Sequence, residues 1–114
     1  MKEFIKGANP YMPLWEHVPD GEPRVFEHNG EKRVYVYGSH DIEVTQYCGK
    51  NYVVWSAPVD DLTNWTCHGV AYESHYDDSI LYAPDVVKKD DTYYMYAAER
   101  KGSLVVVASS KTPW

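Results

Sequence analysis

The sequence has few cysteines, no cluster of basic residues and no long apolar run. Its two cysteines, Cys48 and Cys67, are too few and too far apart for a disulfide framework or a cysteine-based zinc site. The net charge of −6 and the lack of a basic patch argue against nucleic acid and against an anionic membrane surface as partners. Because no apolar run is long enough for a signal peptide or a membrane span, we expect a cytoplasmic protein.

The sequence also lacks clear helical and metal-binding patterns, and it has little phenylalanine. No segment shows a convincing helical periodicity. The histidines have no spacing that indicates a metal site, so we expect no cofactor. Only 2 Phe accompany 11 Tyr and 4 Trp. Tyr and Trp combine a flat apolar face with a polar group, which suits half-buried and ligand-facing positions.

The apolar and aromatic residues form short runs that are typical of β-strands. Turn-forming pairs separate the runs, among them Asn29-Gly30 and Lys101-Gly102. Short runs rich in Val and Tyr at this spacing predict an all-β protein. The expected strands cover residues 25–27, 33–38, 51–57, 68–73, 85–88, 92–98 and 104–109.

Several of these runs are apolar or aromatic on both faces. In RVYVYG, Val34 and Val36 point to one side of the strand and Tyr35 and Tyr37 to the other. Three further runs are likewise apolar or aromatic on both faces: NYVVWSA, TYYMYAA and SLVVVAS. A sheet with one wet face would alternate apolar and polar residues, so we expect sheets that are covered on both faces. This favours the blades of a β-propeller over a two-sheet sandwich.

A repeat supports propeller blades. EPRVFEHNGEKRVYVYG aligns with APDVVKKDDTYYMYA, which places Pro23 over Pro84 and Val25 over Val86. The offset of about 50–60 residues matches the period of a propeller blade. We therefore expect an N-terminal segment over residues 1–18, a first blade over 19–66 and a second over 67–114. The alternative is that any β protein rich in Tyr and Val aligns with itself this well.

Beyond the repeat, the order of motifs resembles the N-terminal part of glycoside hydrolase family 43. The most specific motifs are SAPVDDLTNW and YAPDVV, and the likeness runs over residues 9–114. The resemblance implies a partial five-bladed β-propeller, of which this chain holds about the first two blades. It also implies arabinofuranosidase or xylosidase activity on pentose-containing oligosaccharides. The remaining blades would come from the same parent chain or from an associated chain.

The resemblance also implies a catalytic residue. The family uses a carboxylate base in the first blade, a second carboxylate that modulates pKa and a general acid in later blades. The base is typically an Asp followed by Pro where the first inner strand opens. Here the residue before Pro23 is Glu22, the first candidate, with Asp20 as runner-up. The alternative is that both are only turn residues of PDGEP. Because the other two carboxylates fall outside this chain, we expect the chain alone to be inactive.

Four further residues are candidates for binding substrate. Arg24 and Asp85 occupy matching positions in the repeat, where they could line the channel; an ion pair between adjacent blades is the alternative. His40 and Asp41 follow a predicted strand in YGSHD and could contact sugar hydroxyls; a surface turn is the alternative. Trp55 lies within a strand, which favours packing over a sugar platform.

Two other functions stay open for the chain by itself. It could be a non-catalytic carbohydrate-binding module, or a structural β-domain whose aromatic residues only pack. In either case an incomplete propeller leaves an apolar blade face bare. We therefore also expect the isolated chain to self-associate.

Overall fold

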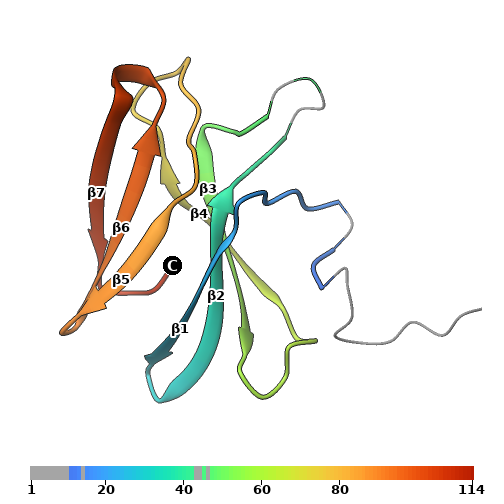
Figure 1. Cartoon of the computed structure of the whole chain (residues 1–114). Helices are drawn as coiled ribbons and strands as arrows, with labels where there is room; N and C mark the ends of the chain where they lie inside the picture. Colours follow the sequence, from blue (N-terminus) through green and yellow to red (C-terminus); the bar gives the residue numbers. More distant parts are fainter. Residues whose placement is uncertain (1–10, 14, 43–44, 46) are drawn as a thin grey trace, which may run out of the picture.

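The computed structural model describes residues 11–13, 15–42, 45 and 47–114, and it is all-β as predicted (Figure 1). Each expected strand falls within an observed one. In the described residues the helical structure is one 3₁₀ turn, η1 (Lys101–Ser103). No described helix has the length and apolarity needed to cross a membrane. The strands are β1 (Glu22–His28), β2 (Glu31–Ser39), β3 (Asn51–Pro58), β4 (Thr66–Glu73), β5 (Asp85–Lys89), β6 (Thr92–Glu99) and β7 (Leu104–Ser110).

The strands form two antiparallel sheets in chain order. The first sheet has the order β1-β2-β3-β4 and the second the order β5-β6-β7. Two-residue turns join the first two strands of each sheet. Asn29 and Gly30 take the positive φ angles of 51° and 79°, which suit the tight hairpin turn that matches strand twist. The turn predicted at Asn29-Gly30 is therefore confirmed.

The boundary between the two sheets differs from the one expected at residues 66 and 67. All of β4 except its first residue, Thr66, lies beyond that boundary, yet β4 pairs with β3 and completes the first sheet. The connection between the sheets therefore falls between Glu73 and Asp85. The repeat could not show this, because the second sheet has three strands in this chain and offers no counterpart of β4.

The core lies between the two sheets, which face each other. Alternation along each strand sends one set of side chains into this layer. Phe26 of β1 meets Tyr93 of β6 edge-on, with ring centroids 5.2 Å apart. The buried core residues are Tyr35, Tyr37, Tyr52, Val54, Leu81, Val86, Tyr93, Met95 and Ala97.

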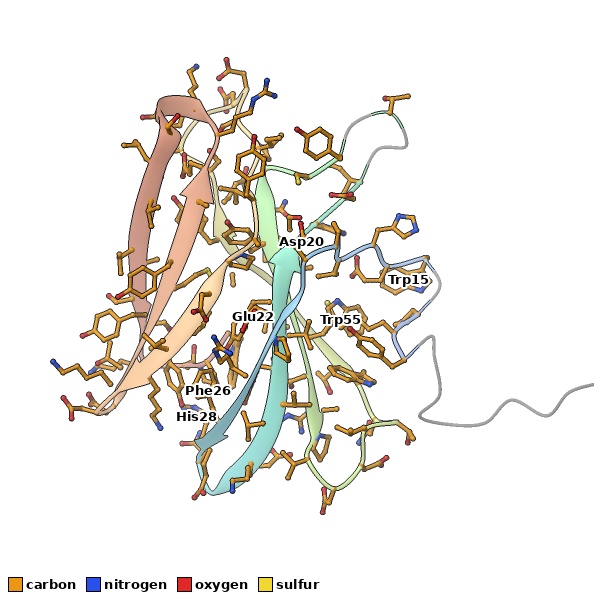
Figure 2. All side chains as sticks on the ribbon, viewed as in Figure 1. Trp15, Asp20, Glu22, Phe26, His28 and Trp55 are labelled. Carbon is orange, nitrogen blue, oxygen red and sulfur yellow. The ribbon has the colours of Figure 1, made fainter. Side chains whose placement is uncertain are left out.

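The opposite face of the first sheet is covered by residues 11–13 and 15–18. Trp15 packs against Trp55 with ring centroids 5.9 Å apart, on the side of the sheet away from β5–β7 (Figure 2). A side chain at Gly38 would come within 2.3 Å of Val18 Cγ1, so this close approach needs glycine. Trp55 is only 5% exposed. Trp55 is therefore a packing residue, which confirms the prediction from the sequence.

The outward face of the second sheet is exposed and apolar. Val87, Tyr96, Val105 and Val107 lie on this face and are 41–68% exposed. The expectation that both faces of each sheet are covered therefore holds for the first sheet and is wrong for the second. The second sheet presents a row of apolar side chains from three neighbouring strands.

We expect this apolar face to make the isolated chain self-associate. The double substitution Val105→Lys and Val107→Lys should shift the chain toward monomer in sedimentation velocity. Surface changes of this kind alter stability by only about 0.5 kcal/mol, so the melting temperature should hardly move. The pair Lys32→Glu and Lys89→Glu, on the exposed ends of two strands, is the control. Equal sedimentation of the wild-type chain and the Lys variant would contradict the prediction.

Candidate functional site

Two acidic residues mark the starts of the first strands of the two sheets. Glu22 begins β1 and Asp85 begins β5. These two strands contact each other where the first sheet meets the second (Figures 1 and 2). Arg24 lies two residues after Glu22, so both side chains project from the same side of β1. The start of β1 thus meets the start of β5 in a small charged cluster.

Arg24 joins the two carboxylates. Its Nη1 lies 2.5 Å from Glu22 Oε1 and its Nη2 lies 2.7 Å from Asp85 Oδ1. Its Nε also donates to Asp85 Oδ1 at 3.1 Å. The side chains of Glu22, Arg24 and Asp85 are 34%, 37% and 48% exposed, so all three can meet a ligand. The ion pair that the sequence offered as an alternative is confirmed.

The contacts of Asp85 involve only one of its carboxylate oxygens. Oδ1 also accepts a hydrogen bond of 2.7 Å from the backbone N–H of Val86. The Oδ2 atom takes part in none of these contacts. Asp85 can therefore hold Arg24 and still offer one oxygen to a donor such as a sugar hydroxyl.

Asp20 lies in the turn that leads into β1, where its side chain is exposed. Its φ of 54° is left-handed, a conformation that Asp tolerates better than most residues. A side chain at Gly21 would lie 2.9 Å from Val36 Cγ1, so the turn is packed closely onto β2. Asp20 and Glu22 therefore share one end of the first sheet, on a turn of fixed shape.

His40 and Asp41 lie at the same end, just past β2. The backbone N–H of His40 donates to Asn51 O at 3.1 Å, and that of Asp41 donates to His17 O at 3.1 Å. Both residues are half-buried rather than exposed on a turn. The Oδ1 atom of Asp41 is buried and has no hydrogen-bond partner among the described residues. An unpartnered buried acceptor is costly, so it marks a place where a donor can bind.

The buried thiol of Cys48 lies near the carboxylates at this end of the sheet, and its pKa is raised. Burial raises the pKa of Cys48, and the nearby carboxylates of Asp41 and Asp20 raise it further. The thiol stays protonated near neutral pH and is a poor nucleophile. Asp20, Glu22, His40 and Asp41 lie at one end of the first sheet, where Glu22 pairs with Arg24 on the face toward β5 and His40 contacts Glu16 on the opposite face.

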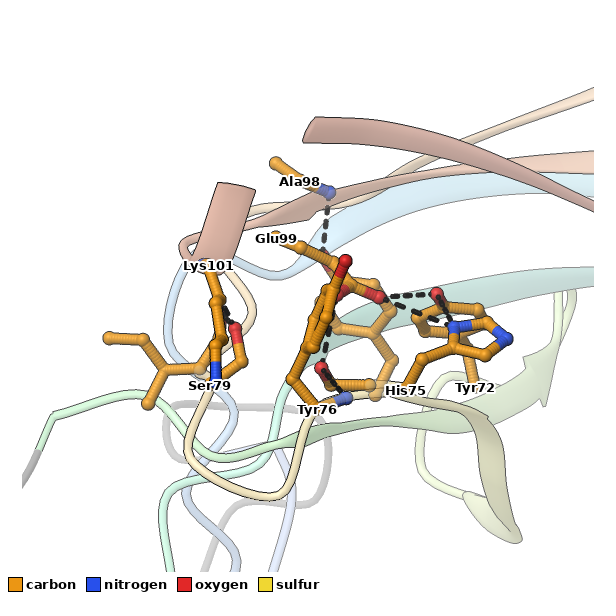
Figure 3. Close-up of polar contacts among 10 residues, drawn as sticks. Tyr72, His75, Tyr76, Ser79, Ala98, Glu99 and Lys101 are labelled. Carbon is orange, nitrogen blue, oxygen red and sulfur yellow. Dashed lines mark hydrogen bonds and ion pairs between the residues drawn. The ribbon is translucent and has the colours of Figure 1, made fainter. Parts of the chain in front are cut away.

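A buried polar cluster around Glu99, which was not predicted from the sequence, links the two sheets (Figure 3). Glu99, at the end of β6, is 2% exposed. Its Oε1 accepts a hydrogen bond of 2.5 Å from Tyr72 Oη and lies 3.7 Å from His75 Nδ1. Its Oε2 accepts one of 3.1 Å from Ser74 Oγ. Burial acts to raise the pKa of Glu99, but these hydrogen bonds outweigh it and leave the pKa below its usual value.

The alternation of β6 contains the signal for this cluster. Tyr93, Met95 and Ala97 face the core, and Glu99 follows in the same register. A charged residue on the core-facing register needs buried partners. In the described part of the chain, this cluster included, no group of three or more His, Cys, Asp or Glu is arranged to hold a metal ion.

Comparison with known proteins agrees with a hydrolase origin. The chain matches no known family profile. A protein from Thermoclostridium stercorarium named xylosidase/arabinosidase is 48% identical to it, in an alignment that covers 92% of this chain and 23% of that protein. The chain therefore spans less than a quarter of the length of this relative. The two proteins are homologous, and the relative's name denotes a glycosidase.

Proposed function

We propose that this chain is the N-terminal part of a glycoside hydrolase that cleaves pentose-containing oligosaccharides with inversion. The observation that carries the proposal is the cluster of Glu22, Arg24 and Asp85 at the starts of two neighbouring inner strands. The 48% identity to a protein named xylosidase/arabinosidase supports it. The chain would supply the first two blades of a five-bladed propeller of family 43. The exposed face of its second sheet would pack against the next blade.

In this proposal Glu22 is the general base. Arg24 holds one of its oxygens, Oε1, which leaves the other free to take a proton from water. An inverting glycosidase keeps its base and acid about 6.5–9.5 Å apart, so that water fits between the base and the sugar. The acid would belong to a later blade, on the far side of the central channel. Asp85 and Arg24 would bind sugar hydroxyls beside the base.

Asp20 is the alternative base. It lies on the same turn, and its exposed side chain is free of the Arg24 ion pair that engages Glu22. His40 and Asp41 would line the sugar pocket in either case, because both lie at this end of the first sheet. The unpartnered Oδ1 of Asp41 is suited to accept a hydrogen bond from a sugar hydroxyl.

A chimeric protein tests this function. This chain is substituted for the matching part of the Thermoclostridium stercorarium relative, and the chimera is assayed with aryl xylosides and aryl arabinofuranosides. We expect the chimera to hydrolyse at least one of these substrates, and the isolated chain to hydrolyse neither. NMR of the first product formed should show the inverted anomer.

Two outcomes would count against the hydrolase. The first is a chimera that melts cooperatively but has no activity. The second is activity with retention of configuration, which would contradict the inverting mechanism. A folded, inactive chimera combined with saturable binding of xylo-oligosaccharides by the isolated chain would instead support a carbohydrate-binding module.

A further inference from the structure

Another acidic residue, Glu16, is buried against the face of the first sheet that residues 11–13 and 15–18 cover. Its side chain is 3% exposed. The indole Nε1–H of Trp55 donates to its Oε2 at 2.9 Å. The backbone N–H of His17 donates to its Oε1 at 3.1 Å. The same Oε1 lies 3.1 Å from Nε2 of His40. Glu16 is therefore a buried carboxylate that accepts two hydrogen bonds and has the His40 imidazole beside it.

Backbone hydrogen bonds fix His40 in front of this carboxylate. The N–H of His40 is bound to Asn51 O, and the N–H of the next residue is bound to His17 O, each at 3.1 Å. The backbone around His40 is thus tied to β3 on one side and to residues 16–17 on the other. The backbone therefore places the imidazole beside Glu16.

This geometry determines which ring nitrogen of His40 carries the proton. A carboxylate oxygen is only an acceptor, and an unprotonated Nε2 of His40 at 3.1 Å would place two lone pairs against each other, so Nε2 carries the proton. In a neutral imidazole the other nitrogen, Nδ1, is then an acceptor. Nδ1 has no partner among the described residues and is not one of the buried unpartnered polar atoms. The His40 side chain is 27% exposed, so Nδ1 is within reach of solvent.

We propose that Glu16 is a positioning residue that fixes the Nε2–H tautomer of His40, so that Nδ1 accepts a hydrogen bond from a substrate hydroxyl. The acceptor lies at the end of the first sheet that also holds Asp20, Glu22 and Asp41. The identity of the hydroxyl as a sugar hydroxyl rests on the proposed function. The tautomer of His40 follows from the buried carboxylate and does not depend on that function.

The tautomer is measured by ¹⁵N NMR of the full chain with labelled histidine, at a pH where His40 is neutral. We expect a protonated-type signal for Nε2 and an unprotonated-type signal for Nδ1. In Glu16→Ala the two signals should move toward the averaged values of a free imidazole. Glu16→Gln keeps the shape of the side chain, and circular dichroism with a thermal melt reports whether each variant is folded. Glu22→Gln, a carboxylate substitution elsewhere at this end of the sheet, should leave the His40 signals unchanged.

A proton on Nδ1 in the wild-type chain, or a His40 tautomer that is unchanged in a folded Glu16→Ala or Glu16→Gln variant, would overturn the proposal. The contact with substrate is tested in an active chimera. There Glu16→Ala should raise KM by about 3–10-fold, the effect of losing one hydrogen bond. An unchanged KM would overturn the contact. Because the NMR result needs no activity, an inactive chimera would refute the hydrolase without deciding the role of Glu16.

Discussion

Glu22→Gln in the chimera is expected to lower kcat by about 10²–10⁴-fold, the usual contribution of a general base. Gln has the size of Glu but cannot take a proton from the attacking water. It can still accept a hydrogen bond from Arg24, so the local structure should persist. KM should change little, because the lost interaction is made with the attacking water. Steady-state kinetics with an aryl glycoside, beside melting curves of both proteins, measure the effect.

The neighbouring carboxylates make this experiment decisive. Asp20→Asn should keep most of the activity, since Asp20 is only the alternative base. Glu27→Gln, on the exposed far end of β1, serves as the control and should match the wild-type chimera. If Asp20→Asn abolished turnover while Glu22→Gln did not, the base would be Asp20. Full activity in both variants would show that PDGEP is only a turn.

Glu99→Gln is expected to lower the free energy of unfolding of the isolated chain by about 1.5–3 kcal/mol, the worth of hydrogen bonds to a charged group. The carboxylate accepts from Tyr72 and Ser74. A Gln amide has a single acceptor oxygen, and its NH₂ group would face one of these donors. For a domain of this size the melting temperature should fall by roughly 4–8 °C per kcal/mol. Thermal denaturation followed by circular dichroism measures the change.

Lowering the pH should reduce the difference in melting temperature between the wild-type chain and Glu99→Gln. The pKa of Glu99 in the folded chain lies below its usual value. Its stabilising effect is therefore complete above the unfolded pKa of about 4.3 and is lost as the pH falls through the folded-state pKa. Glu73→Gln is the matched control, because Glu73 is 51% exposed and forms a surface ion pair with Lys50. Such pairs contribute about 0–1 kcal/mol. Equal melting temperatures for Glu99→Gln and wild type at pH 7 would contradict the role of Glu99.

Sequence patterns alone predict most of the strands and the position of the charged cluster. The alternation in RVYVYG and the turn at Asn29-Gly30 predict a hairpin, because both depend on neighbouring residues. The repeat places Arg24 and Asp85 at matching positions. The sequence could not decide whether Arg24 and Asp85 form an ion pair, because the pair depends on β1 lying beside β5. The same limit applies to β4, whose pairing with the first sheet was not visible in the repeat.

The sequence by itself determined the all-β fold and the strand positions, and it predicted Glu22, at the start of β1, as the candidate base. Tertiary structure alone decided which acidic residues are buried. Glu16 and Glu99 have the chemistry of surface residues. Their burial is possible only because Trp55, His40 and Tyr72 reach them from other strands, 39 positions along the chain in the case of Trp55 and 27 in that of Tyr72. Alternation and turns act between neighbours in sequence. The free energy of a buried charge depends on partners that only the packed sheets bring together.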